Sequence, residues 1–174
     1  MGKERDISVE YFFNFDKLAY LQGKKPDGCI LCLINEGSPE VVNLTVFTNR
    51  LFTVSVNLYP YNPGHLLIFP RRHVEDIREY TTEEETELAR LIRGMLAVVD
   101  ETHSPAGYNI GYNMGLVAGA SIGHLHLHII PRYPRETGIA DLIAGKRVLV
   151  EAPTETAERI RRLLADHPPS ALAS

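Results

Sequence analysis

The sequence predicts an α+β fold: a mostly antiparallel sheet of about five strands, one long helix, and a closing helix near the C-terminus. Short runs of β-branched and aromatic residues, separated by turn residues, predict strands joined in hairpins. One long segment with apolar residues at helical spacing lies between these runs. Strands in hairpins with a single helix between them are typical of an α+β fold.

The N-terminal half begins with an arm over residues 1–28, in which a short helical piece is expected around 16–21. Glycine and proline then break the pattern before the first strands. Thr48-Asn49-Arg50 separates two β-branched runs and predicts the turn of a hairpin. The three strands expected in this half cover residues 41–47, 52–56 and 65–70.

The long helix is expected over residues 82–102. Thr81 and Glu84 have the spacing of a capping box, in which each side chain bonds the other residue's backbone N–H. The apolar residues that follow recur every three or four positions, which places them on one core-facing stripe. They are Leu88, Leu91, Ile92, Met95 and Val99.

The C-terminal half contains two further expected strands, over residues 107–113 and 124–130. The loop between them carries Gly115, Gly119 and Gly123, and glycines of this kind mark tight turns. Residues 134–146 show no regular pattern. Pro153 then opens the closing helix, which extends to about Asp166.

Composition limits the classes of function. A chain of 174 residues with 44% hydrophobic and 23% charged residues is sized for one globular domain. The formal net charge of −4 argues against a general nucleic-acid binder, which needs many cations facing phosphates. No apolar run reaches the roughly 20 residues of a membrane helix, and the N-terminus lacks a secretory signal. Two cysteines make no disulfide framework, so we expect a cytoplasmic protein.

Three histidines occupy alternate positions at His124, His126 and His128. In an extended strand, alternate side chains share a face, so the imidazoles lie together and the apolar residues between them face the core. Covered imidazole nitrogens need partners, and neutral imidazole can ligate, donate, accept or attack. The pattern therefore predicts a site for a metal, a phosphate or both.

The histidine pattern and the segments around it resemble the histidine triad (HIT) family of nucleotidyl hydrolases and transferases. The resemblance implies a HIT-like fold over the whole of residues 1–174, with a core at 29–132 and a C-terminal extension with a helix at 133–174. It also implies a homodimer, and it is strongest to bacterial diadenosine tetraphosphate phosphorylases or hydrolases. The matching segments are Asn57, Pro63–Pro70, Asn109–Gly115, Ala118–Ser121 and His124–Pro131.

The resemblance also implies roles for individual residues. His126, the middle histidine of the triad, would be the nucleophile that attacks phosphorus, and His128 would assist at the substrate phosphate or leaving oxygen. The remaining residues would bind the nucleotide. They are Asn57 at the ribose, Asn113, Gly119 and Ser121 at the phosphates, and His65 as a supporting residue near the triad.

Cys29 and Cys32 have metal-ligand spacing, but they supply only half of a tetrahedral site. They could also be redox active or simply buried. His73 and His124 could complete a structural zinc site, an arrangement that some bacterial HIT proteins and related uridylyltransferases resemble. A magnesium ion brought in with the substrate is left open.

The expected function is cleavage of diadenosine polyphosphates, or of related adenine nucleotides, at the α-phosphate through a nucleotidyl-histidine intermediate. Ala120 stands where eukaryotic hydrolases of the family usually carry glutamine, so the acceptor could be phosphate rather than water. Alternatives are a nucleoside phosphoramidase or adenylylsulfate-type hydrolase, and a non-catalytic nucleotide-binding adaptor. Neighbouring histidines of the three on one straight strand lie about 6 to 7 Å apart, which is too far for them to bind one metal ion together. This spacing disfavours a metal oxidoreductase that uses the three histidines as ligands.

Overall fold

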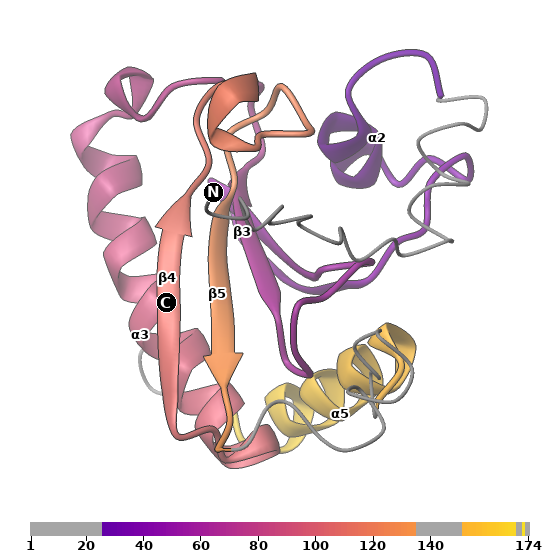
Figure 1. The fold of residues 1–174 in the computed structure, drawn as a ribbon, viewed down its shortest axis with the longest axis vertical. Helices are drawn as coiled ribbons and strands as arrows, with labels where there is room; N and C mark the ends of the chain where they lie inside the picture. Colours follow the sequence, from indigo (N-terminus) through magenta and orange to yellow (C-terminus); the bar gives the residue numbers. More distant parts are fainter. Residues whose placement is uncertain (1–25, 135–150, 170–171, 173–174) are drawn as a thin grey trace, which may run out of the picture. The chain divides into compact units, whose positions relative to one another are not determined.

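The computed structural model describes residues 26–134, 151–169 and 172 (Figure 1). The helical piece expected at 16–21 lies outside the described residues, as does nearly all of the irregular stretch expected at 134–146.

A five-stranded sheet forms the centre of the fold, with strand order β1-β2-β3-β5-β4 (Figure 1). Every neighbouring pair is antiparallel, so the predicted α+β class and sheet are confirmed. The strands span Thr45–Thr48 (β1), Phe52–Val56 (β2), Leu66–Pro70 (β3), Gly107–Tyr112 (β4) and Leu127–Arg132 (β5).

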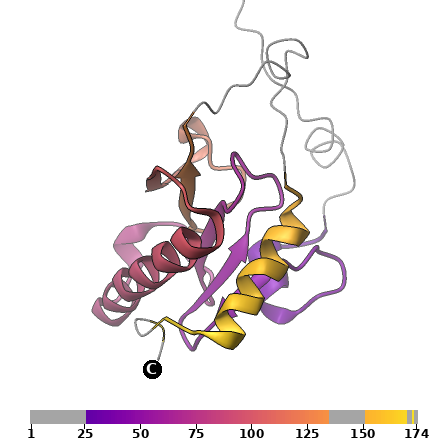
Figure 2. The same ribbon diagram turned by 90° about the horizontal axis from the view of Figure 1, so that it is seen from below.

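Two helices pack on one face of this sheet and against each other (Figure 2). The long helix α3 covers Thr82–His103, and the predicted capping box is present at its start. The closing helix α5 covers Pro153–Asp166, as expected. Their apolar side chains join those of the inward-facing strand residues in one core, in which Leu91, Met95 and Ile160 are fully buried. Among the described residues, no helix is both long and apolar enough to cross a membrane.

The opposite face carries a short helix that the sequence pattern did not predict. Helix α2 covers Ile30–Glu36 and ends at Gly37, whose φ of 71° is the left-handed conformation that glycine adopts without strain. Its buried residue, Leu31, packs on Leu67 and Phe69 of β3. Seven residues are too few for a stable isolated helix, so this contact with the sheet stabilises it.

The histidine strand begins later than predicted. β5 starts at Leu127 rather than at residue 124, and its pairing with β3 ends at Ile68 opposite Leu127. The residues just before Leu127 pair with the loop after β3 instead. There the Leu125 N–H donates to the Val74 carbonyl at 2.6 Å. The expected alternation persists, because Leu125 and Leu127 enter the core while His126 lies on the other face.

Candidate functional site

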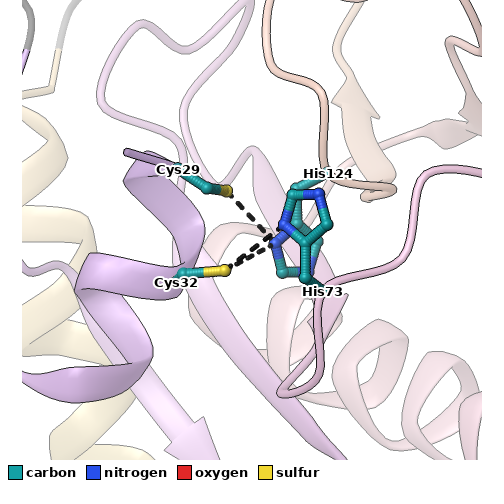
Figure 3. Close-up of side chains that lie close together, drawn as sticks. All are labelled: Cys29, Cys32, His73 and His124. Carbon is teal, nitrogen blue, oxygen red and sulfur yellow. Dashed lines mark hydrogen bonds between the residues drawn. The ribbon is translucent and has the colours of Figure 1, made fainter. Parts of the chain in front are cut away.

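Four potential metal ligands converge beside the start of α2 (Figure 3). Cys29 immediately precedes the helix and Cys32 lies in its first turn, so both sulfur atoms point the same way. His73 comes from the loop after β3, and His124 from the segment before β5. Their four ligand atoms all lie within 4.8 Å of one another.

The distances suit a tetrahedral zinc ion. The Sγ atom of Cys29 lies 3.3 Å from His124 Nδ1, and that of Cys32 lies 3.4 Å from His73 Nδ1 and 3.5 Å from His124 Nδ1. Zn–S and Zn–N bonds of ordinary length at a tetrahedral angle would separate sulfur from nitrogen by about 3.6 Å. Two thiolates and two imidazoles are also ligands that zinc prefers. The residues therefore fit a zinc ion.

Groups behind the two histidines fix their orientation. The Nε2–H of His124 donates to the Pro70 carbonyl at 3.0 Å, which leaves Nδ1 with its lone pair toward the sulfur atoms. His73 Nε2 lies 3.3 Å from the Glu75 carboxylate. Metal-binding histidines ordinarily use their second nitrogen in this way.

Burial keeps two side chains of the cluster, Cys32 and His124, uncharged. Burial, followed by the neighbouring Cys29 thiol, raises the pKa of Cys32 to about 11. Burial lowers the pKa of His124 to about 4. The Cys32 thiol therefore keeps its proton at neutral pH unless a cation lies beside it, and a divalent metal ion would stabilise the thiolate form that binds metal.

His126 is held by its own backbone. Its Nδ1 lies 2.7 Å from the carbonyl oxygen of His124, and because a carbonyl only accepts, Nδ1 must carry the proton. Burial lowers the pKa of His126, so the ring is neutral near pH 7 and its Nε2 keeps a lone pair. The arrangement leaves the lone pair of His126 Nε2 unprotonated, the state in which an imidazole nitrogen can attack an electrophile.

Two neighbouring groups, the Tyr61 N–H and the His65 ring, decide which ring nitrogen of His128 carries the proton. The Tyr61 N–H donates to Nδ1 of the fully buried His65 at 3.1 Å. Burial, then the neighbouring His128 and His126, lowers the pKa of His65 to about 3, so the ring is neutral and carries its proton on Nε2. That Nε2–H donates to His128 Nδ1 at 3.0 Å.

His128 consequently carries its own proton on Nε2, since burial lowers its pKa to about 4 and leaves it neutral. This Nε2 is buried and has no hydrogen-bond partner among the described residues. The ring of His128 lies beside that of His126, with ring centroids 4.8 Å apart. A buried donor without a partner among the described residues, next to a second neutral imidazole, is suited to bind an anionic oxygen.

The structure places Asn57 with the histidines, at the end of β2. Its Oδ1 accepts the Tyr59 N–H at 3.1 Å, and its Nδ2 lies 3.3 Å and 3.4 Å from the two ring nitrogens of His65. The side chain therefore caps a local turn as well as flanking the site.

The three predicted phosphate-binding residues lie on the loop between β4 and β5. Gly119 ends a 3-10 turn, η2 (Leu116–Ala118), in the left-handed conformation, and its N–H donates to the Leu116 carbonyl at 3.0 Å. Ser121 is exposed and Asn113 is half-buried. No hydrogen bond between described residues joins these three to the histidines.

Several contributors at the site were not identified from the sequence, namely the Pro70 and His124 carbonyls, the Tyr61 N–H and the Glu75 carboxylate. Backbone groups leave no signature in side-chain patterns, so only Glu75, two residues after His73, offered a signal.

A family model described as HIT domain matches residues 38–135, which is more than half of the 174 residues. The chain belongs to the HIT domain family. Among solved structures, this HIT protein resembles a zinc-bound histidine triad family protein from Mycobacterium smegmatis, with a TM-score of 0.63 and 24% identity over 80% of this chain and 94% of that one. That likeness supports the fold.

Two curated relatives are enzymes by name. The chain is 37% identical over 123 residues to an AP-4-A phosphorylase from Mycobacterium tuberculosis, covering 70% of this chain and 61% of the relative. It is 35% identical over 97 residues to an asymmetrical bis(5'-nucleosyl)-tetraphosphatase from Schizosaccharomyces pombe, covering 56% and 53%. The matches thus span somewhat more than half of each relative's length.

Proposed function

We propose that this HIT protein cleaves diadenosine polyphosphates at an α-phosphorus through a covalent nucleotidyl intermediate on His126. The hydrogen bond from His126 Nδ1 to the His124 carbonyl carries the proposal, because it holds the proton on Nδ1 and leaves the lone pair of Nε2 for attack. The names of the two enzyme relatives support the same substrate class.

In the first step, Nε2 of His126 forms a bond to the α-phosphorus. The bond from that phosphorus to the bridging oxygen breaks, and the electron pair leaves with the polyphosphate. The positive charge on the substituted imidazole is stabilised by the His124 carbonyl, which still accepts from Nδ1. The Nε2–H of His128 donates a hydrogen bond to an anionic oxygen of the reacting phosphates.

In the second step, an acceptor oxygen attacks the same phosphorus and the N–P bond breaks, returning its electron pair to Nε2. Water must lose a proton to solvent in this step, whereas an anionic phosphate oxygen need not. Two inversions give net retention at phosphorus. We propose that Asn57, His65, Asn113, Gly119 and Ser121 complete the nucleotide site.

We further propose that Cys29, Cys32, His73 and His124 hold one structural zinc ion. With four protein ligands it would have no open position for substrate, so it would supply rigidity rather than Lewis-acid chemistry. Its ligand His124 also provides the carbonyl that orients His126. A magnesium ion accompanying the polyphosphate is assigned to no residue of the protein.

Assembly as a homodimer is part of the proposal. β4 is an outer strand of the sheet and pairs only with β5 among the described strands. Ile110 in its middle is 43% exposed. A second copy could pair along this edge, which would cover the unpaired backbone groups.

Three other expectations also remain proposals. They are a cytoplasmic location, no binding of a specific nucleic acid, and a HIT core over residues 29–132 within a single domain.

The acceptor is tested by incubating the protein with diadenosine tetraphosphate, with and without inorganic phosphate. A phosphorylase yields ATP and ADP, whereas a hydrolase yields AMP and ATP. We expect phosphate to be the acceptor, because Ala120 lacks an amide near the leaving phosphates and the 37% identical relative is named a phosphorylase.

If phosphate changes neither the rate nor the products, the acceptor is water. Turnover of adenosine phosphoramidate or adenylylsulfate alone would favour the alternative hydrolases. Nucleotide binding without any turnover would leave only a nucleotide-binding adaptor.

A further inference from the structure

Asn35 lies on α2 three residues after Cys32, outside the four-ligand set. Its side chain makes three hydrogen bonds to other elements. Nδ2 donates to the carbonyls of Pro70 and Arg71, both at 3.2 Å, and Oδ1 accepts from the Thr53 hydroxyl at 2.7 Å. Because the two carbonyls can only accept, the orientation of the amide is fixed.

The Pro70 carbonyl also accepts from the zinc-facing histidine. His124 Nε2 lies 3.0 Å from this oxygen, and Asn35 Nδ2 lies 3.2 Å from it. A carbonyl oxygen has two lone pairs, so one oxygen at the end of β3 serves both α2 and His124. The Asn35 side chain thereby connects the helix that carries Cys32 to the strand end that orients His124.

We propose that Asn35 is a positioning residue for the metal centre, which locks α2 to the end of β3 so that all four ligands meet before the metal binds. This inference rests on the proposed zinc site. His73 follows Pro70 by three residues, so the same clamp also sets the start of the loop that presents the fourth ligand.

Packing alone gives α2 little restraint. The helix has seven residues and one buried side chain, Leu31. Apolar contact is not directional, so it does not fix how far a helix slides or rotates on the sheet. Any such movement would change the S–N separations of 3.3 to 3.5 Å on which the metal site depends. Hydrogen bonds from one amide to β2 and to two successive carbonyls remove that freedom.

Two substitutions separate the hydrogen bonds from the size of the side chain. N35D keeps the shape but sets a carboxylate oxygen against the Pro70 and Arg71 carbonyls, and N35A removes the amide. N43A is the matched control, because Asn43 is exposed and only accepts the Thr45 N–H at 2.9 Å. Zinc affinity is measured by competition with a chromogenic chelator, and site geometry by the absorption spectrum of bound cobalt.

We expect N35D and N35A to raise the Kd for zinc by about 10- to 100-fold, the usual effect of losing a group that orients metal ligands. The tetrahedral cobalt spectrum should weaken or shift in both variants. N43A should change the Kd by less than about twofold.

Unchanged zinc Kd and cobalt spectra in N35D and N35A would overturn the inference. It would also be wrong if these variants lowered the melting temperature of the metal-free protein while leaving the Kd unchanged, because Asn35 would then only hold the helix. A wild-type protein that takes up no zinc would overturn the metal site and the inference together. Zinc uptake by the wild type, with unaffected variants, would overturn the inference alone.

Discussion

Replacing the buried carboxylate of Glu84 by an amide should destabilise the protein substantially. Glu84 is 3% exposed. Its carboxylate accepts from Arg72 Nε at 2.6 Å and Nη2 at 2.8 Å, and from the Thr81 N–H at 2.8 Å. The side chain thus closes the capping box of α3 and anchors Arg72, which directly precedes the proposed zinc ligand His73.

The magnitude follows from these contacts. Glu84→Gln keeps the size but removes the charge. Its NH₂ group must face a guanidinium N–H in either orientation, and in one of them it also faces the Thr81 N–H. A hydrogen bond to a charged group contributes about 1.5–3 kcal/mol, and a cap about 1 kcal/mol. These add to about 2.5–4 kcal/mol. Since Arg72 is 45% exposed and can regain water, we discount the sum to roughly 1.5–3 kcal/mol. For a chain of this length, that lowers the melting temperature by roughly 3–12 °C.

Glu83 provides the matched control in the next position. It pairs with Arg50, and both side chains are exposed, so Glu83→Gln should cost less than about 1 kcal/mol. Both variants and the wild type are compared by thermal melting and by urea unfolding at pH 7. An E84Q protein that melts within about 1 °C of the wild type would refute the reasoning.

The same contact predicts a dependence on pH. Hydrogen bonds from Arg72 lower the pKa of Glu84 from 4.5 to about 2. The unfolded chain therefore takes up a proton at Glu84 before the folded protein does. The stabilisation is complete well above pH 4.5 and is lost as the pH falls toward 2. Between pH 6 and pH 3.5, the difference in unfolding free energy between wild type and E84Q should narrow by roughly 1 kcal/mol.

Three further predictions concern the site and its supports. His126→Asn should lower kcat by about 10³-fold or more and abolish the mass increase of a trapped nucleotidyl-enzyme, while nucleotide binding in a titration persists; near-normal turnover would exclude a covalent role for His126. Chelation of the metal, or Cys29→Ser, should lower the melting temperature and should increase amide hydrogen exchange in α2 more than in α3. An equal increase in both helices would count against a zinc site beside α2. Gly64→Ala should lower the free energy of unfolding by about 2 kcal/mol, measured by urea denaturation. Gly64 has a φ of 78°, and an added Cβ would lie 3.2 Å from side-chain atoms of His103 and Pro131. An unchanged urea midpoint would show that the turn accepts the methyl group without strain.

Short-range patterns in the sequence determined most of the fold. Thr81 and Glu84 predicted the start of α3, because a capping box needs only neighbouring residues. The alternation of His124–Ile129 predicted which side chains enter the core, since a strand places every second residue on the same face. Helix α2 was missed, because a seven-residue helix has too little periodicity to detect and depends on its contact with β3.

Only the tertiary structure decided how the site is assembled and which nitrogens are free. Cys29 and His124 lie 95 residues apart in the chain, and their meeting depends on where α2 rests on the sheet. The sequence showed a histidine at position 126, but the carbonyl of His124 decides that Nδ1 carries the proton and that Nε2 is left to react. Likewise, the Tyr61 N–H, acting through His65, sets the proton on His128. Backbone donors and acceptors are the same in every residue, so the sequence does not show which of them a side chain meets until the chain has folded.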